Sequence, residues 1–265
     1  MRRVAKRLAL TVDAALPRAD GVVILSYHRV GRRTLSPVDM DRGMFRDQMQ
    51  YLADGRSVID MDSAVEVISD PDSPHGSKVI SFDDGTADFV DEVLPVLVDL
   101  DLPVTVFVAT AHIDLQREFP GGAKPLTWDG LRECVSTGLV TVGSHTHTHA
   151  LLDRTDYLSA QLELDTSIGR IREEIGISPL HFAYPKALLG NPESEEAVRA
   201  RFHSASLAGT RANRPGEADP WRLQRSPIQN ADEWDGFVRK TEGGMRAEDD
   251  VRRVLNTVRY RGLAA

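Results

Sequence analysis

The chain has 265 residues, of which 41% are hydrophobic and 27% charged, and its formal net charge is −8. This length is ample for one hydrophobic core and small for two, so we expect a single main domain. The acidic balance disfavours a nucleic-acid partner held by phosphate contacts, because such contacts need a basic face. The single cysteine, Cys134, excludes an internal disulfide and a cysteine-cluster metal site.

Residues 1–20 are interpreted as a basic N-terminal extension, and residues 21–265 as the domain. Met1 to Arg7 is basic, and Asp13 interrupts the partly apolar stretch that follows. No small-residue cleavage site precedes Pro17, so we expect no secretory signal and a cytoplasmic protein. With no run of about eighteen apolar residues, no transmembrane helix is expected either. The extension is expected to form a short surface helix, with a weak contact to an anionic membrane as the alternative.

Apolar runs alternate with apolar residues at helical spacing along the rest of the chain. The runs predict buried strands, and the spacing and capping residues predict helices. In the longest helix, the residues expected to face the core are Leu158, Leu162, Ile168, Ile171 and Ile175. Repeated strand–helix units predict a mostly parallel sheet, either open or closed into a barrel. In chain order, the expected elements are a strand at 22–25, a helix around 45–52, a strand at 58–59, a helix at 63–68, a strand at 79–82, a helix at 95–100, a strand at 104–108, a helix at 127–138, a strand at 139–142, a helix at 158–175, a strand at 181–184 and a helix at 193–201.

Two polar motifs directly follow two of the expected strands. Asp83 and Asp84 stand on a glycine turn after one strand, and the segment 143–149 after another carries three histidines. The carboxyl ends of parallel strands meet at one face, so the two motifs can converge. One carboxylate and two imidazoles are a common ligand set for a divalent metal, and the second carboxylate is then free to act as a base. The pattern indicates metal-assisted hydrolysis.

Both motifs also have simpler interpretations. Asp-Asp-Gly is a common turn, and histidines four residues apart can be surface residues on one helical turn. If the segment 143–149 is extended, His145, His147 and His149 face one way and form a three-histidine metal site. If the chain turns into a helical start, His145 and His149 face together and His147 points away. The glycine and serine before the run favour the turn, so we expect His145 and His149 to be the ligands.

Five segments, in this order, resemble motifs of the polysaccharide deacetylases of carbohydrate esterase family four, which contain the NodB-homology domain. The similarity runs from about Val22 to Ile228, and the Tyr27-His28 pair looks like the opening of the bacterial exopolysaccharide-modifying branch. In the second segment Ser81 replaces the usual threonine. The matching segments are 24–30, 80–85, 126–128, 143–149 and 182–185.

This resemblance implies a distorted (β/α) barrel of mostly parallel strands, TIM-like with about seven strands. It implies a hydrolase that removes acetyl groups from N-acetylhexosamine units of a polysaccharide or glycan. An O-acetyl polysaccharide esterase and a non-catalytic glycan-binding relative are the alternatives. The implied partner is therefore an acetylated glycan, while the oligomeric state stays open.

Carried over residue by residue, the resemblance assigns roles within the two motifs. Asp84, His145 and His149 would bind a divalent metal, most often zinc in this family, with cobalt, nickel or manganese as alternatives. Asp83 would be the general base that takes a proton from the metal-bound water. The backbone N–H of Lys186 would stabilise the oxyanion.

Two family features are missing from the sequence. The arginine that braces the catalytic aspartate in many members is replaced by Ala183, and we hypothesise that Arg225 supplies this charge, with a surface arginine as the alternative. The C-terminal histidine that serves as general acid is also absent, and His28 is the expected replacement, with a buried structural histidine as the alternative. Tyr184, Pro185 and Trp128 are the expected substrate contacts.

Overall fold

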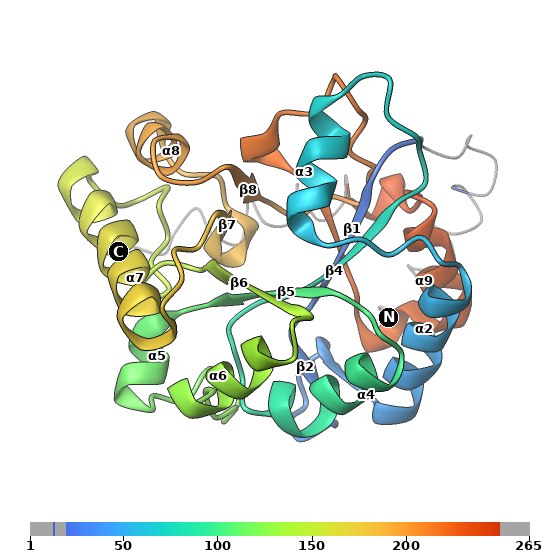
Figure 1. Cartoon of the computed structure of the whole chain (residues 1–265), viewed down its shortest axis with the longest axis horizontal. Helices are drawn as coiled ribbons and strands as arrows, with labels where there is room; N and C mark the ends of the chain where they lie inside the picture. The colour runs from blue at the N-terminus through green and yellow to red at the C-terminus, as the bar shows by residue number, and fades with distance from the viewer. Residues whose placement is uncertain (1–12, 14–19, 250–265) are drawn as a thin grey trace.

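Seven parallel strands form one strongly curved sheet that is nearly closed into a barrel (Figure 1). The computed structural model describes residues 13 and 20–249, so the expected N-terminal extension lies outside the described residues apart from Asp13 and Asp20. The strand order is β8-β7-β6-β5-β4-β1-β9. A parallel bridge between Ser206 and Leu223 links the two edges of the sheet. The expected barrel of about seven mostly parallel strands is therefore confirmed.

The strands are short and buried, and their ends lie nearly level. Tyr27 pairs with Phe82 at the carboxyl ends of β1 and β4, and Val108 pairs with Ser144 at the ends of β5 and β6. Polar residues that follow these strands are consequently brought to one face of the barrel. The strands of the main sheet are β1 Val23–Tyr27, β4 Lys78–Phe82, β5 Val104–Val108, β6 Val140–Ser144, β7 His181–Ala183, β8 Ser204–Ser206 and β9 Arg225–Pro227, and a two-stranded sheet contains β2 Arg29–Val30 and β3 Asp39–Met40.

Helices surround the sheet, and side-chain caps mark where many of them begin. The side chain of Asp41, Asp60, Thr127, Asp156 or Asn191 accepts a backbone N–H of the first turn at the start of α2, α3, α6, α7 and α8 respectively. No helix among the described residues is long and apolar enough to span a bilayer. The helices are α2 Arg42–Asp54, α3 Met61–Ser69, α4 Leu94–Asp99, α5 Thr110–Leu115, α6 Trp128–Ser136, α7 Tyr157–Ile175, α8 Pro192–Arg199 and α9 Glu233–Thr241, with a π-helical turn η1 Phe89–Val93 and 3-10 turns η2 Pro185–Ala187, η3 Pro220–Arg222 and η4 Asn230–Asp232.

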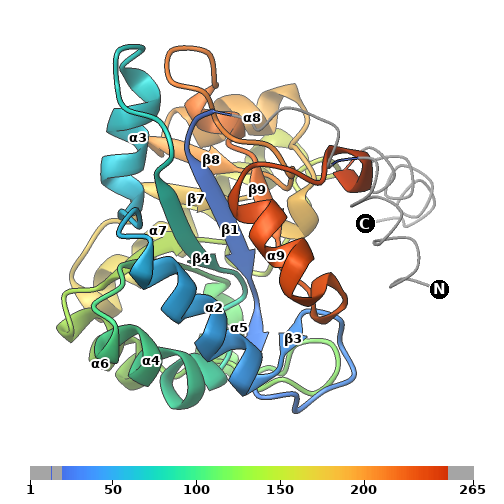
Figure 2. The same ribbon diagram turned by 90° about the vertical axis from the view of Figure 1, so that its right-hand side faces the viewer.

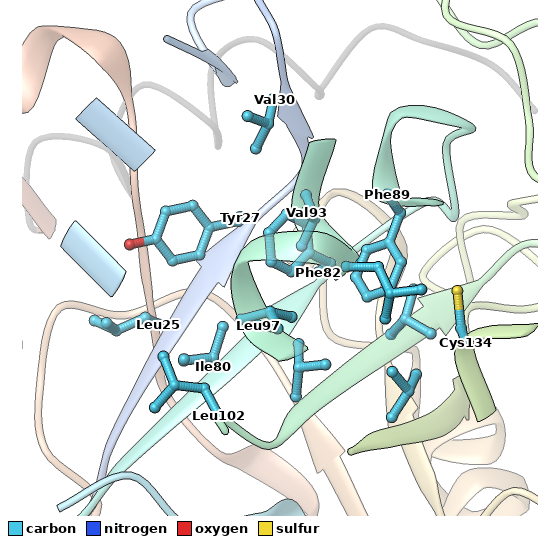
Figure 3. Close-up of a cluster of buried hydrophobic side chains, with 14 of the residues drawn as sticks. Leu25, Tyr27, Val30, Ile80, Phe82, Phe89, Val93, Leu97, Leu102 and Cys134 are labelled. Atoms are coloured by element: carbon cyan, nitrogen blue, oxygen red, sulfur yellow. The ribbon is translucent and has the colours of Figure 1, made fainter. Parts of the chain in front are cut away.

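The larger part of the core lies between the outer face of the sheet and the helices. Alternate residues of β1 and β4 project toward α2, η1 and α4, among them Tyr27 and Phe82 (Figure 3). Their rings pack with those of Phe45 and Phe89 at centroid distances of 5.2 to 5.9 Å. On another side, α9 lies beside β1 (Figure 2). This packing fixes β1, β4 and β9, the strands from which several site residues emerge.

The opposite faces of β1 and β4 build a second cluster inside the barrel. Ile24 and Val79 pack there with Phe107 of β5, and α3 adds apolar side chains to the same cluster. Gly143 of β6 is required at this point, because a Cβ atom there would lie 2.4 Å from the Phe107 ring. The interior of the barrel is therefore a packed core.

The expected buried face of α7 is partly wrong. Leu158 and Leu162 are 74% and 68% exposed, whereas Leu164 and Ser167 are buried. The Ser167 and Ser144 hydroxyls lie 2.8 Å apart in a hydrogen bond, which docks the helix on β6 through small polar residues. Hydrophobic spacing alone could not detect a helix face that is partly polar.

Candidate metal centre and catalytic cavity

Asp84, His145 and His149 converge at the carboxyl ends of β4 and β6. The Asp84 Oδ1 atom lies 3.8 Å from His145 Nε2 and 3.6 Å from His149 Nε2. One ligand atom from each of the three side chains lies within 4.8 Å of the other two. His145 Nδ1 lies 2.7 Å from the Ala183 carbonyl oxygen, so this nitrogen donates a proton and Nε2 keeps its lone pair. The donor set and the fixed tautomer fit a divalent cation.

The turn after β4 gives Asp84 its position. Asp84 has φ 75° and Gly85 has φ 81°, so the chain turns sharply through two consecutive left-handed residues. A Cβ atom on Gly85 would lie 2.9 Å from a Val108 methyl group, which restricts this position to glycine. Asp84 is therefore held at the strand end by both the turn and the neighbouring strand β5.

The histidine segment is neither extended nor helical. Thr146 and His149 both have positive φ, 63° and 65°, so the backbone leaves the extended strand conformation at two points within the segment. The rings of His145 and His149 approach to a centroid distance of 4.9 Å. His147 turns away, and its Nδ1 atom lies 2.8 Å from the Thr110 hydroxyl. The structure thus brings His145 and His149 together and leaves His147 outside the cluster, by a geometry that neither expected alternative described.

Burial and mutual charge keep the two histidines in the state that a metal ligand needs. Burial and the neighbouring His145 together lower the pKa of His149 to about 3, against the opposing effect of Asp84. Burial likewise lowers the pKa of His145. Burial alone would raise the pKa of Asp84, but the adjacent histidines and Lys186 lower it below its ordinary value. At neutral pH the cluster consists of two neutral imidazoles and one carboxylate.

Asp83 points to the same cavity and is bound by Arg225 of β9. The Arg225 Nη1 and Nη2 atoms lie 2.5 and 2.8 Å from Asp83 Oδ1 and Oδ2. The Arg225 side chain is only 2% exposed, and its guanidinium lies 5.1 Å from the centre of the Phe107 ring. Burial alone would raise the pKa of Asp83, but Arg225, with His145 and His28, holds it well below its usual range. Arg225 is therefore a buried partner of Asp83 and not a surface arginine.

His28 follows β1 and reaches the cavity from the side of Asp83. Its Nε2 atom lies 3.9 Å from Asp83 Oδ2, and its side chain is 26% exposed. Its Nδ1 atom is buried and has no hydrogen-bond partner within residues 20–249. His28 is therefore partly open to the cavity and close to the carboxylate, in a position from which a proton can be exchanged with a bound molecule.

The cavity has a volume of about 220 Å³, and His147 is not among its lining residues. The charged and imidazole side chains described above that line it are His28, Asp83, Asp84, His145, His149 and Arg225. Lys186 also lines it and is exposed, with φ 55°. Apolar and amide side chains complete the wall, namely Val38, Ala187, Ala208, Pro227 and Gln229.

The expected substrate contacts lie elsewhere. Tyr184 is fully buried and packs edge-on against Phe182, and Pro185 is buried at the start of η2. Trp128 does not line the cavity, and its indole N–H donates to Asp114 Oδ1 at 2.9 Å. None of the three residues lines the cavity.

Two residues near the metal cluster had no clear signal in the sequence. Arg29 is buried, with Nη2 4.0 Å from Asp84 Oδ2 and Nη1 donating to the Pro120 carbonyl at 3.0 Å. His112 stacks on Phe119 with ring centroids 3.9 Å apart and contacts His149 edge-on at 6.5 Å. Strand alternation predicts that Arg29 faces away from His28, so its approach to Asp84 could not be expected from the sequence.

The fold and the site together define a barrel protein whose aspartate–histidine–histidine cluster could hold a metal ion. A sequence model of the polysaccharide deacetylase family matches residues 70–202, which is half of the chain. The chain belongs to the polysaccharide deacetylase family, as the five sequence segments indicated.

Individual relatives match most of the chain. The poly-beta-1,6-N-acetyl-D-glucosamine N-deacetylase of Staphylococcus epidermidis is 24% identical over 248 residues, which cover 82% of this chain and 84% of that protein. The structure of IcaB from Ammonifex degensii superposes with a TM-score of 0.71 at 26% identity, covering 85% of this chain and 98% of that one. The Streptococcus pyogenes deacetylase PplD in complex with acetate has a TM-score of 0.72 at 18% identity, covering 85% and 99%, and shares the fold.

Proposed function

We propose that this protein is a metal-dependent N-deacetylase that acts on a polymer of β-1,6-linked N-acetylglucosamine. One observation carries the proposal: a buried, arginine-bound aspartate and an aspartate–histidine–histidine cluster line the same cavity. The similarity to the Staphylococcus epidermidis enzyme, which is named for this polymer, supports the choice of substrate.

Asp84, His145 and His149 would hold the divalent cation, and their donor atoms suit zinc best, with cobalt, nickel and manganese as alternatives. When bound, the cation supplies Lewis acidity that polarises the acetyl carbonyl and makes a water molecule easier to ionise. The hydrogen bond from His145 Nδ1 to Ala183 holds the ring in its ligand orientation.

Asp83 would act as the general base. Arg225 keeps its carboxylate ionised at neutral pH and fixes both oxygens, so Asp83 is ready to accept the proton of the attacking water. The Ser26 hydroxyl donates to the same carboxylate at 3.5 Å. The backbone N–H of Lys186, at the rim of the cavity, would donate to the oxygen on which negative charge develops.

His28 would act as the general acid. Water oxygen bonds to the acetyl carbon, the carbon–nitrogen bond breaks, and the departing nitrogen needs a proton to leave as an amine. His28 Nε2 lies 3.9 Å from Asp83 Oδ2, and the side chain is partly exposed to the cavity, so it could donate this proton. The products are acetate and a glucosamine unit.

The test is acetate release from acetylated glucosamine oligosaccharides by the metal-stripped protein and by the same protein reloaded with zinc, cobalt, nickel or manganese. We expect acetate only after reloading, and none from an Asp83→Asn variant that binds the same amount of metal. Equal acetate release by the stripped protein would reject metal dependence, and an active Asp83→Asn variant would reject the assignment of the base.

A further inference from the structure

Lys186 is a cation at the rim of the catalytic cavity whose charge no neighbour neutralises. It is exposed, it lines the cavity, and in the part of the chain that the structure describes no hydrogen bond or ion pair involves its ammonium group. Its backbone is fixed by the buried Pro185 before it and by the left-handed φ of 55° that both Lys186 and Ala187 adopt. The ammonium group also acts on the site, because it lowers the pKa values of Asp84 and His149.

The other charges of the cavity do not offset this cation. The bidentate pair of Asp83 and Arg225 is neutral as a unit. The single carboxylate of Asp84 leaves one net positive charge once a divalent cation is bound. The cavity of the loaded protein is therefore positive, although the whole chain has a formal net charge of −8.

We propose that Lys186 makes the enzyme discriminate between glycans by charge, so that an acetylated unit next to a free amine is a poorer substrate than one between acetylated neighbours. This inference rests on the proposed deacetylase function and adds to it. Each acetyl group removed leaves an amine that is positively charged when protonated. A rim cation disfavours binding of that amine close to the cavity, where low-dielectric walls focus the field.

The expected size of the effect follows from the exposure of the lysine. Exposed charge pairs contribute about 0.2 to 1 kcal/mol, which corresponds to roughly a 1.4- to 5-fold difference in kcat/KM. Salt weakens the effect, because the screening length falls from about 10 Å at 0.1 M to about 3 Å at 1 M. Because units next to a free amine would react more slowly, the free amines would be spaced along the product chain rather than clustered.

The test compares two oligosaccharides of equal length with the zinc-loaded protein, one fully N-acetylated and one with a single free amine beside an acetylated unit. The variants are Lys186→Met, which removes the charge, and Lys186→Arg, which keeps it; both retain the backbone N–H. The matched control is Lys124→Met, because Lys124 is exposed and lies in a different cavity.

We expect the parent, Lys186→Arg and Lys124→Met proteins to prefer the fully acetylated oligosaccharide, and Lys186→Met to lose that preference. The preference of the parent should also shrink at 1 M salt. A parent protein without preference, or an unchanged preference in Lys186→Met, would overturn the role of Lys186 and leave the deacetylase function standing. Absence of acetate from both oligosaccharides with every variant would instead overturn the proposed function and this inference with it.

Discussion

Arg225 binds both carboxylate oxygens of Asp83, although the two residues are 142 positions apart in the sequence. The contact joins the end of β4 to β9, the last strand of the sheet, and both side chains are buried. By its resemblance to the family, Ala183 stands at the position expected to hold a bracing arginine. The positive charge reaches the aspartate from a different strand, and it keeps the buried carboxylate ionised.

The first prediction concerns this ion pair. Arg225→Met should lower the free energy of unfolding by roughly 3–5 kcal/mol, because Asp83 is left buried without its partner. Acetate release should fall as well, and Arg225→Lys should restore it only in part, since an ammonium cannot bind two oxygens in parallel. Urea unfolding and initial rates measure the two effects. Arg222→Met is the control, because Arg222 is 48% exposed. Its loss should lower the free energy of unfolding by no more than about 1 kcal/mol. Equal stability of Arg225→Met and the parent would contradict the account.

Metal binding should depend on His145 and not on His147. His145→Ala removes an expected ligand, so bound zinc per chain should fall to a trace. The loss of affinity should exceed the roughly 10- to 100-fold drop that follows removal of a residue that only supports a ligand. His147→Ala removes only a contact with Thr110 and should leave the zinc content unchanged. Elemental analysis after dialysis measures both. Loss of zinc in His147→Ala would point to a three-histidine site.

The loss of rate on removing His28 should be larger for a leaving group that needs a proton than for one that does not. His28→Ala should slow deacetylation of an N-acetylated oligosaccharide by about 10²- to 10⁴-fold. The same variant should hydrolyse 4-nitrophenyl acetate nearly as fast as the parent, because nitrophenolate leaves without protonation. Zinc content should not change. A similar loss of activity on both substrates would mean that His28 holds the site together and does not act as the acid.

A carboxylate outside the site should make stability depend on pH. Burial alone would raise the pKa of Asp114, but hydrogen bonds from Arg170 and Trp128 outweigh it and lower the pKa below its ordinary value. A carboxyl pKa lowered by folding stabilises the protein above its ordinary value of about 4, and the contribution is lost as the pH falls below it. Asp114→Asn should therefore be less stable than the parent at pH 7, by about 1 kcal/mol, and approach it in acid. A difference that grows as the pH falls would contradict the assignment.

The sequence predicted the parts of the fold that have strong local signals. The apolar runs of β1, β4, β5 and β6 and the capped helices α6 and α7 lie where expected, within a few residues. The expected strand at 58–59 is only a single bridge between Val58 and Lys78. Two strands of the main sheet were missed because they have three residues each and little apolar character: Ser204–Ser206 and Arg225–Pro227. The two-residue strands Arg29–Val30 and Asp39–Met40 of the small sheet were missed as well.

In the candidate site, too, residues with a local sequence signal could be identified and contacts without one could not. Asp83, Asp84, His145 and His149 could be named because they follow recognisable strands and form ordered motifs. The partnership of Arg225 with Asp83 could only be hypothesised, since a pairing across 142 residues has no local pattern. Tyr184 is buried and Lys186 is exposed beside a turn in which Lys186 and Ala187 both have positive φ. Lysine and alanine rarely adopt this conformation, so the sequence did not indicate the turn.

The central claim is that the loaded protein hydrolyses the amide of N-acetylglucosamine units, and its most direct test is to measure acetate and new free amine in the same reaction. With a zinc-loaded protein and a β-1,6-linked N-acetylglucosamine oligosaccharide, we expect the two products to appear in equal amounts, and neither with Asp83→Asn. Acetate without amine from an O-acetylated glycan, together with no release from the N-acetylated one, would contradict the claim and identify an esterase.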